Sequence, residues 1–272
     1  MSDWLTIHRG SAPLVVAMPH TGTDLPADIA PLFTSEWDAR RDADWWIDHL
    51  YDFACEMGAS IVRTAISRSV IDVNRDPSGV SLYPGMATTS LCPVDNFDGA
   101  PLYTNGGPDD AEIARRRDIY FTPYHTALNA ELGRLRAEHG RVVLYDAHSI
   151  RSRIPRLFDG ELPQFNIGTN DGATCAPELA QAVEAICAAH DSTVLNGRFK
   201  GGWTTRHYGE PDRGIHPIQM ELSMRGYLRE PDGLPTTGNW PVPYDPTFAA
   251  PMIATLRDVL GACLTFAQGV KK

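Results

Sequence analysis

The sequence predicts an α/β fold with a mainly parallel sheet. Short apolar runs of strand length alternate along the chain with longer segments whose apolar residues recur at helical spacing. Two of the apolar runs end directly in a histidine. Apolar residues make up 43% of the chain, which is enough to bury a sheet between helices. We find no repeat of constant period, so we expect one domain over residues 1–272 with a single core.

The first apolar run predicts a buried strand over 13–18 that delivers His20 to a turn. Apolar residues at helical spacing then predict a helix over 43–57, and Gly58 follows it as a stop signal. Asp44 would lie in the first turn of that helix.

Two β-branched runs, 60–66 and 70–73, predict further strands. Pro77 would end the second strand and leave Asn74 and Arg75 close to its carboxyl end. The following stretch, 78–108, is rich in Gly, Pro, Asn, Asp and Thr, which is typical of a long binding loop or lid.

A long helical stretch is predicted over 109–139, with Pro123 causing a kink or a break. We interpret its basic cluster, Arg115-Arg116-Arg117, as a solvated face. A strand over 141–146 follows and leads to His148, which repeats the arrangement of a strand followed by a histidine.

The rest of the chain continues the alternation of strands and helices. We expect strands over 165–169, 193–195 and 216–223, helices over 177–189 and 246–268, and a glycine-rich loop over 197–214.

Composition excludes several classes of partner. The net charge is −10, from 24 basic and 34 acidic residues, and it argues against nucleic acid and anionic membranes. The five cysteines contain no CxxC pair, so a reducing cytoplasm is the expected location. The N-terminus lacks the basic and apolar regions of a signal peptide, and we expect no stretch of transmembrane length.

Two histidines at strand ends predict a metal site, because a catalytic zinc needs three protein ligands and an open position. His20 and His148 are the candidate pair, although a single histidine after a strand is more often structural. The third ligand would be a carboxylate near the same sheet edge. The candidates are Asp24, Asp42, Asp44, Asp146 and Glu221.

Two of these carboxylates have other possible roles. Asp146 lies two residues before His148, so both would point to the same face, and the Asp would either orient a neighbouring group or cap the turn. Glu221 interrupts an apolar strand and suits a general base with a raised pKa, or else lies on the solvent face of an edge strand.

Arginines occur close to the same strand ends, at Arg68, Arg75 and Arg206. Their planar guanidinium groups would bind carboxylates or an oxyanion, unless they form ordinary surface ion pairs. A thiol hydrolase using Cys92 or Cys175 is a weaker alternative, because neither lies in a recognisable nucleophile motif.

These motifs together resemble the N-formylglutamate amidohydrolase (N-formylglutamate deformylase) family, which acts in bacterial histidine degradation. The resemblance covers nearly the whole chain. It is carried by MPHTG at 18–22, DADWWIDHLYDFACEMGAS at 42–60, SRSVIDVNRDP at 67–77, LYDAHSIRSRIPRLFDGELPQFNIGT at 144–169, NGRFKGGWTTRHYG at 196–209 and HPIQMEL at 216–222.

The resemblance implies a three-layer α/β sandwich of the zinc-exopeptidase (phosphorylase/hydrolase-like) type, with a mainly parallel mixed sheet and its site at the carboxyl edge. The implied metal ligands are His20, Asp44 and His148, with Asp24 as the alternative to Asp44. Glu221 would be the base, and Asn74 and Arg75 would contact the substrate and the oxyanion.

The implied reaction is metal-dependent hydrolysis of N-formyl-L-glutamate to formate and L-glutamate. Arg68 and Arg206 would bind the two substrate carboxylates, with His207 and Tyr208 nearby. The metal would be zinc, with manganese, cobalt or iron possible, and the protein a cytoplasmic monomer or small homo-oligomer. The alternatives are a related zinc hydrolase acting on another N-acyl amino acid and a non-catalytic dicarboxylate-binding protein.

Overall fold

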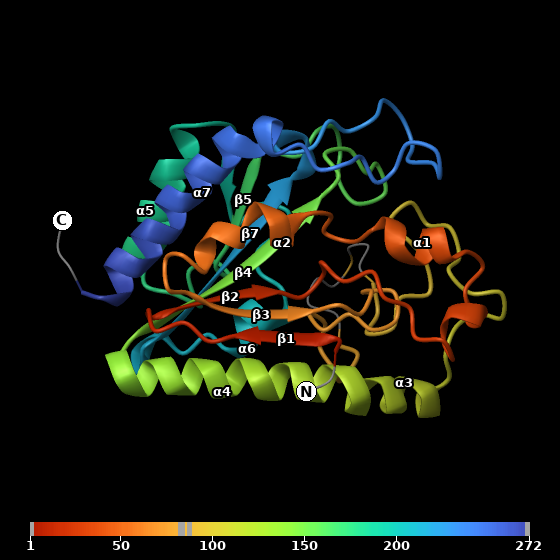
Figure 1. Ribbon diagram of the computed structural model, residues 1–272, viewed down its shortest axis with the longest axis horizontal. Coiled ribbons are helices and arrows are strands. Elements are labelled where there is room, and N and C mark those ends of the chain that lie inside the picture. The colour runs from red at the N-terminus through yellow and green to blue at the C-terminus, as the bar shows by residue number, and fades with distance from the viewer. Residues whose placement is uncertain (1–2, 81–84, 86–88, 270–272) are drawn as a thin grey trace.

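A computed structural model describes residues 3–80, 85 and 89–269, and a seven-stranded mixed sheet forms its centre (Figure 1). The strand order is β1-β3-β2-β4-β7-β5-β6. Four neighbouring pairs are parallel, and two, β1 with β3 and β5 with β7, are antiparallel. The strands are β1 (Leu5–His8), β2 (Leu14–Met18), β3 (Ser60–Thr64), β4 (Val142–Ile150), β5 (Phe165–Gly168), β6 (Thr193–Leu195) and β7 (Ile215–Ser223).

Helices cover both faces of the sheet, which confirms the predicted three layers. In Figure 1, α4 runs along one face, and α5 and α7 lie on the other. Side chains of β2 alternate between the two cores: Leu14 and Val16 pack with residues of α7, whereas Val15 packs with residues of α4. The helices are α1 (Glu36–Arg41), α2 (Ile47–Leu50), α3 (Asp110–Arg116), α4 (Thr122–His139), α5 (Pro177–Ala188), α6 (Trp203–His207) and α7 (Pro246–Ala267).

Two predicted elements near the N-terminus are wrong. The helix predicted over 43–57 is interrupted because Trp46 adopts a left-handed conformation, φ 63°, and its indole donates to the carbonyl of Val242. Only α2 and a short 3-10 turn, Asp52–Ala54, remain helical. The run at 70–73 is not a strand but a buried turn, in which the backbone N–H of Val70 donates to Ser67 and that of Asp72 donates to Leu91.

Other boundaries differ in ways that matter for the site. The strand predicted over 141–146 continues to Ile150, so His148 lies within β4 and not beyond its end. The glycine-rich loop predicted over 197–214 contains the short helix α6. Neither β1 nor α1 was predicted. The predicted loop at 78–108 lies partly outside the described residues, and its described part contains no helix or strand.

The helix predicted over 109–139 breaks, as expected around Pro123. α3 ends at Arg116, the turn Arg117–Phe121 is π-helical, and α4 then begins with Pro123 in its first turn. The prediction of a solvated basic cluster is only partly right, because Arg116 is fully buried, whereas Arg115 is exposed and Arg117 is half-buried. The guanidinium of Arg116 donates to the carbonyl of Val70, to the hydroxyl of Tyr103 and to the carboxylate of Glu112.

Arg116→Ala should therefore destabilise the protein by about 3 kcal/mol, because it leaves several buried polar groups without their charged donor. Arg117→Ala, at the next residue, is the matched control and should change the free energy of unfolding by less than about 0.5 kcal/mol. Urea denaturation of both variants measures the difference. Equal stabilities would show that the buried guanidinium contributes nothing.

The expectation of no transmembrane-length segment is wrong for α7, which has 22 residues and a mean hydropathy of 1.3 in its best window. Core packing accounts for part of this composition, because 44% of that window is buried. Leu256, Val259 and Leu260 are fully buried in the core that α7 shares with α5 and the sheet. This is the arrangement of a core helix in a globular α/β protein.

Candidate active site

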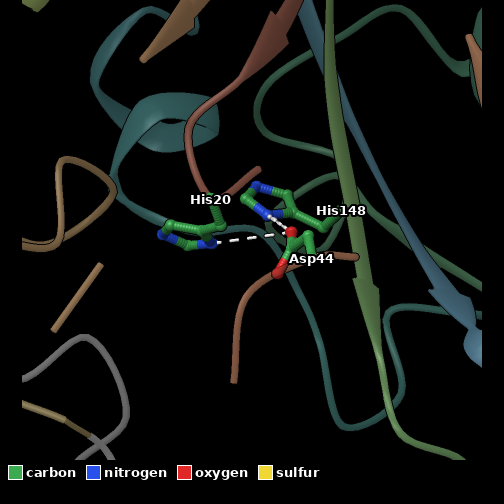
Figure 2. Close-up of side chains that lie close together, drawn as sticks. All are labelled: His20, Asp44 and His148. Atoms are coloured by element: carbon green, nitrogen blue, oxygen red, sulfur yellow. Dashed lines mark hydrogen bonds and ion pairs between the residues drawn. The ribbon is translucent and has the colours of Figure 1, made fainter. Parts of the chain in front are cut away.

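Two histidines and an aspartate converge at the carboxyl ends of β2 and β4 (Figure 2). His20 follows β2, His148 lies on β4, and Asp44 lies in the turn between α1 and α2. One ligand atom from each lies within 4.8 Å of the others, and all three side chains are buried. The backbone N–H of Asp44 donates to the carbonyl of His20 at 2.9 Å, which holds the turn against the end of β2.

The carboxylate of Asp44 lies between the two rings. Its Oδ2 is 3.1 Å from Nδ1 of His148 and 3.7 Å from Nδ1 of His20, and it accepts from the backbone N–H of Ser149. Of the other candidate ligands, Asp42 instead accepts from the backbone N–H of Phe97. Asp24 and Asp42 are both outside the cluster.

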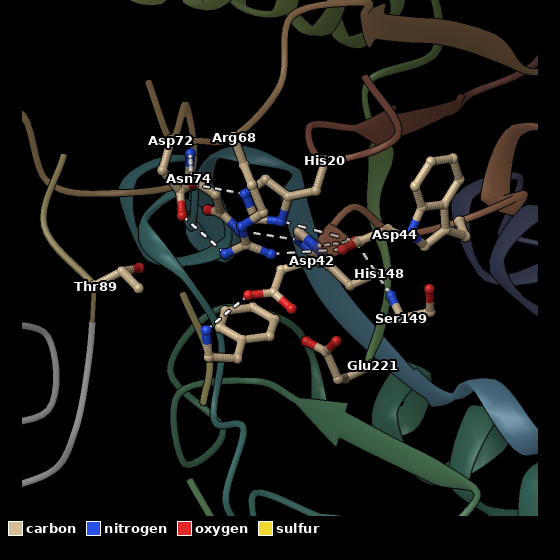
Figure 3. A network of polar contacts seen from close by, with 12 residues as sticks. His20, Asp42, Asp44, Arg68, Asp72, Asn74, Thr89, His148, Ser149 and Glu221 are labelled. Carbon is tan, nitrogen blue, oxygen red and sulfur yellow. Dashed lines mark hydrogen bonds and ion pairs between the residues drawn. The ribbon is translucent and has the colours of Figure 1, made fainter. Parts of the chain in front are cut away.

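A second pair of carboxylates, Asp72 and Asp146, lies on the other side of the two imidazoles, and Figure 3 shows Asp72 with His20. Nε2 of His20 is 2.6 Å from Oδ1 of Asp72, and Nε2 of His148 is 3.1 Å from Oδ1 of Asp146. A carboxylate in this position keeps the ring proton on Nε2 and leaves the Nδ1 lone pair for a cation. The prediction that Asp146 shares a face with His148 and orients a neighbouring group agrees with this geometry.

The cluster has the donor set that a divalent metal requires. In the described part of the chain, Nδ1 of His20 and Oδ1 of Asp44 are buried without a hydrogen-bond partner. Burying such atoms without a partner costs free energy unless an ion or a proton satisfies them. Two imidazoles and one carboxylate match a zinc site of the hydrolytic type, so the residues fit the predicted group.

The electrostatics of the cluster also favour a cation. Burial alone would raise the pKa of Asp44, but His20 and His148 outweigh it and hold that pKa well below its usual range. Burial opposes charge on His148, yet Asp146 and Asp44 raise its pKa well above the usual value. The carboxylate of Asp44 therefore stays ionised and would attract a metal ion in place of a ring proton.

Glu221 lies beside His148, because β7 pairs with β4 in a register that sets the two residues opposite each other. Its side chain is buried, so the alternative of a solvent-facing edge residue is wrong. Burial raises its pKa to about 8, with His148 opposing the shift and Asp44 adding to it. A buried carboxyl group that titrates near neutrality is suited to moving protons.

Asn74 links the cluster to α6 and to the loop before this helix. Its side-chain oxygen accepts from the backbone N–H of Thr204 at 2.8 Å, and its Nδ2 lies 2.9 Å from Nε2 of His148. Gly202 packs against this amide so closely that a Cβ would lie 2.5 Å from Nδ2 of Asn74. Gly202 in turn donates its N–H to Gln219, whose amide lies 3.4 Å from Glu221.

The predicted arginines have different environments. Arg68 is buried and pairs with Asp72 at 2.9 Å, and its Nη1 is 3.5 Å from Asp44. Arg75 donates to the hydroxyl of Thr89. Arg206 donates its Nε to the carbonyl of Gly201.

A pocket opens over the cluster, and its lining separates the predicted residues into two groups. Within the described chain, α6 with Arg206, His207 and Tyr208 is not part of the lining, and the substrate-binding role of these three stays a prediction. Tyr208 is buried and bonds to His125. The lining consists of His20, Arg68, Asn74, Arg75, Thr89, Phe97, His148, Ile150, Arg156, Leu157, Arg198, Phe199, Gly202, Gln219 and Glu221.

The sequence did not reveal several residues that lie at the site. Asp72 was hidden inside a run that reads as a strand, and Gln219 has the ordinary appearance of a polar residue in a strand. The thiol alternative gains no support, because burial raises the pKa of Cys92 to about 11 and that of Cys175 to about 12. Neither sulfur would be an ionised nucleophile near neutral pH.

A His₂Asp cluster and a buried glutamate lie together at the carboxyl edge of an α/β sheet, which is the arrangement of a hydrolase whose active site can hold a metal. Residues 12–228 match the N-formylglutamate amidohydrolase family, and the chain belongs to that family.

Similar proteins cover nearly the full length. The chain is 45% identical to an N-formylglutamate deformylase of Pseudomonas aeruginosa over 98% of both chains. It is 44% identical to one of Pseudomonas putida, covering 98% of this chain and 97% of the relative. The crystal structure of an N-formylglutamate amidohydrolase from Ralstonia eutropha superposes with a TM-score of 0.76 at 26% identity, over 98% of both chains.

Proposed function

We propose that this protein hydrolyses the formyl amide of N-formyl-L-glutamate and releases formate and L-glutamate. The observation that carries the proposal is the convergence of His20, Asp44 and His148 beside the buried Glu221 in a chain of the N-formylglutamate amidohydrolase family. A deformylase needs a cation site, a proton carrier and an anion-binding pocket, and the residues proposed for these three roles lie close together.

His20, Asp44 and His148 would hold one divalent ion, zinc or alternatively manganese, cobalt or iron. When bound, such an ion would polarise the formyl carbonyl and promote ionisation of the attacking water. Asp72 and Asp146 contact Nε2 of the two imidazoles and would so leave Nδ1 of each ring for a bound ion.

Glu221 is the proposed proton carrier. Its carboxylate accepts a proton from the water that attacks the formyl carbon, and it then returns the proton to the leaving amino nitrogen as the C–N bond breaks. Asn74 and Arg75, on the pocket wall, would donate hydrogen bonds to substrate oxygens and to the developing oxyanion. Arg68 would add positive charge for a carboxylate, although Asp72 and Asp44 already neutralise much of it.

We further propose a cytoplasmic enzyme with one amidohydrolase domain over residues 1–272, acting as a monomer or small homo-oligomer. The net charge of −10 supports the view that neither nucleic acid nor an anionic membrane is its partner.

Comparing N-formyl-L-glutamate with N-acetyl-L-glutamate tests the substrate. The proposal predicts release of L-glutamate from the formyl compound in strong preference to the acetyl compound. Preference for the acetyl compound would favour the alternative of another N-acyl hydrolase. Binding of both without turnover by metal-loaded protein would favour a non-catalytic dicarboxylate-binding protein.

Gly202→Ala should lower kcat/KM for formate release by at least about 10-fold, because the added methyl group must displace the Asn74 amide. Gly133→Ala is the matched control, since a Cβ at this position in α4 meets nothing within 4 Å. Steady-state assays of both variants make the comparison. Wild-type activity in Gly202→Ala would mean that the position of Asn74 is unimportant for turnover.

A further inference from the structure

We propose that Arg156 and Arg198 bind the side-chain carboxylate of the substrate and thereby select a dicarboxylate. Both arginines line the pocket over the His₂Asp cluster. This inference rests on the proposed function and deepens it, because it assigns specificity to two residues outside the predicted site.

Charge in the pocket is distributed unevenly. Among the residues that the structure describes, the lining contains four arginines, Arg68, Arg75, Arg156 and Arg198, and a single carboxylate residue, Glu221. The first two arginines lie near the cluster: Arg68 pairs with Asp72 and Asp44, and Nε of Arg75 is 3.5 Å from Asp72. The positive charge of Arg68 is therefore largely committed to the protein itself. Arg156 and Arg198 come from other loops and add two guanidinium groups to the wall, and Arg156 shares its charge with Asp95.

The two arginines are held in place by the backbone. Arg156 donates Nη1 to the carbonyl of Asn96 at 2.8 Å, pairs with Asp95 at its exposed side, and packs against Gly99. Arg198 donates Nε to the carbonyl of Leu157 at 2.9 Å. Anchoring of this kind reduces the entropy lost when a guanidinium binds a carboxylate.

Apolar side chains complete the wall on which the arginines lie. Phe97, Ile150, Leu157 and Phe199 all line the pocket, and they pack in one cluster with Ile154 and Leu162. A glutamyl substrate presents two methylene groups between its α-carbon and its terminal carboxylate. With the formyl group at the His₂Asp cluster, the methylenes would lie on the apolar side chains and the terminal carboxylate would reach Arg156 and Arg198.

The test compares N-formyl-L-glutamate with N-formyl-L-glutamine, which has the same shape but no terminal charge. Wild type is expected to prefer the glutamate compound. Arg156→Gln and Arg198→Gln should each lower kcat/KM for it by about 10- to 100-fold, mainly through KM, and leave turnover of the glutamine compound little changed. Arg153→Gln is the matched control, because this arginine lies in the same loop as Arg156 but is exposed and pairs with Glu161.

The outcomes separate the inference from the function on which it rests. Variants that lose activity equally on both substrates, or that keep the wild-type preference, would overturn the inference while leaving the deformylase intact. Wild-type protein that releases formate from neither substrate would overturn the proposed function, and the inference with it.

Discussion

Glu221→Gln is expected to lower kcat for formate release from N-formyl-L-glutamate by about 10²- to 10⁴-fold, the usual contribution of a general acid–base group. Glutamine has nearly the same shape but cannot accept the proton of the attacking water. The buried site should tolerate the neutral amide, since burial already raises the pKa of Glu221 to about 8. The variant should therefore fold normally.

Metal binding separates this prediction from simple damage to the site. Because Glu221 is not one of the three clustered residues, Glu221→Gln should bind a divalent ion as wild type does. Glu138→Gln, on the exposed surface of α4, is the control and should retain full activity. A Glu221→Gln variant that keeps activity within a few-fold of wild type would remove Glu221 from the mechanism.

Asp44→Asn is expected to weaken divalent-metal affinity by more than about 100-fold and to abolish formate release in proportion. Removal of a group that only orients a ligand typically costs about 10- to 100-fold in affinity, so loss of a ligand charge should cost more. Asp72→Asn should show only this smaller loss of metal affinity, because Asp72 contacts His20 on the side away from Asp44. Metal titration followed by calorimetry measures both affinities.

Asp24→Asn is the matched control, since Asp24 is the alternative ligand from the sequence and lies outside the cluster. We expect it to bind metal as wild type does. Loss of metal in Asp24→Asn together with normal binding in Asp44→Asn would reverse the assignment of the third ligand.

Much of the site follows from strand ends. His20 and His148 could be predicted because buried apolar runs precede them, and parallel strands bring their carboxyl ends to one edge. The physical pattern alone could not choose Asp44 among five carboxylates, because its position depends on a turn that docks on the carbonyl of His20. The resemblance to a family supplied that choice. Asp72 escaped prediction because local β-branched composition does not reveal a buried turn.

The fold was predictable where periodicity is strong and failed where tertiary contacts override it. The long helix is broken near Pro123 as expected, because the missing N–H and the ring of a proline disturb a helix at the proline itself. The left-handed Trp46 and the buried Arg116 could not be foreseen, because both depend on partners distant in sequence, Val242 and Val70. The pocket arginines Arg156 and Arg198 belong to the same class, since convergence of loops cannot be predicted from spacing.

Deformylation by this protein should depend on one divalent ion held by His20, Asp44 and His148. A titration of chelator-treated protein with zinc tests this most directly, with bound metal and formate release from N-formyl-L-glutamate recorded in the same samples. We expect formate release to be absent without metal and to rise in proportion to bound metal up to one ion per chain. Full activity of metal-free protein, or one bound ion without formate release, would contradict it.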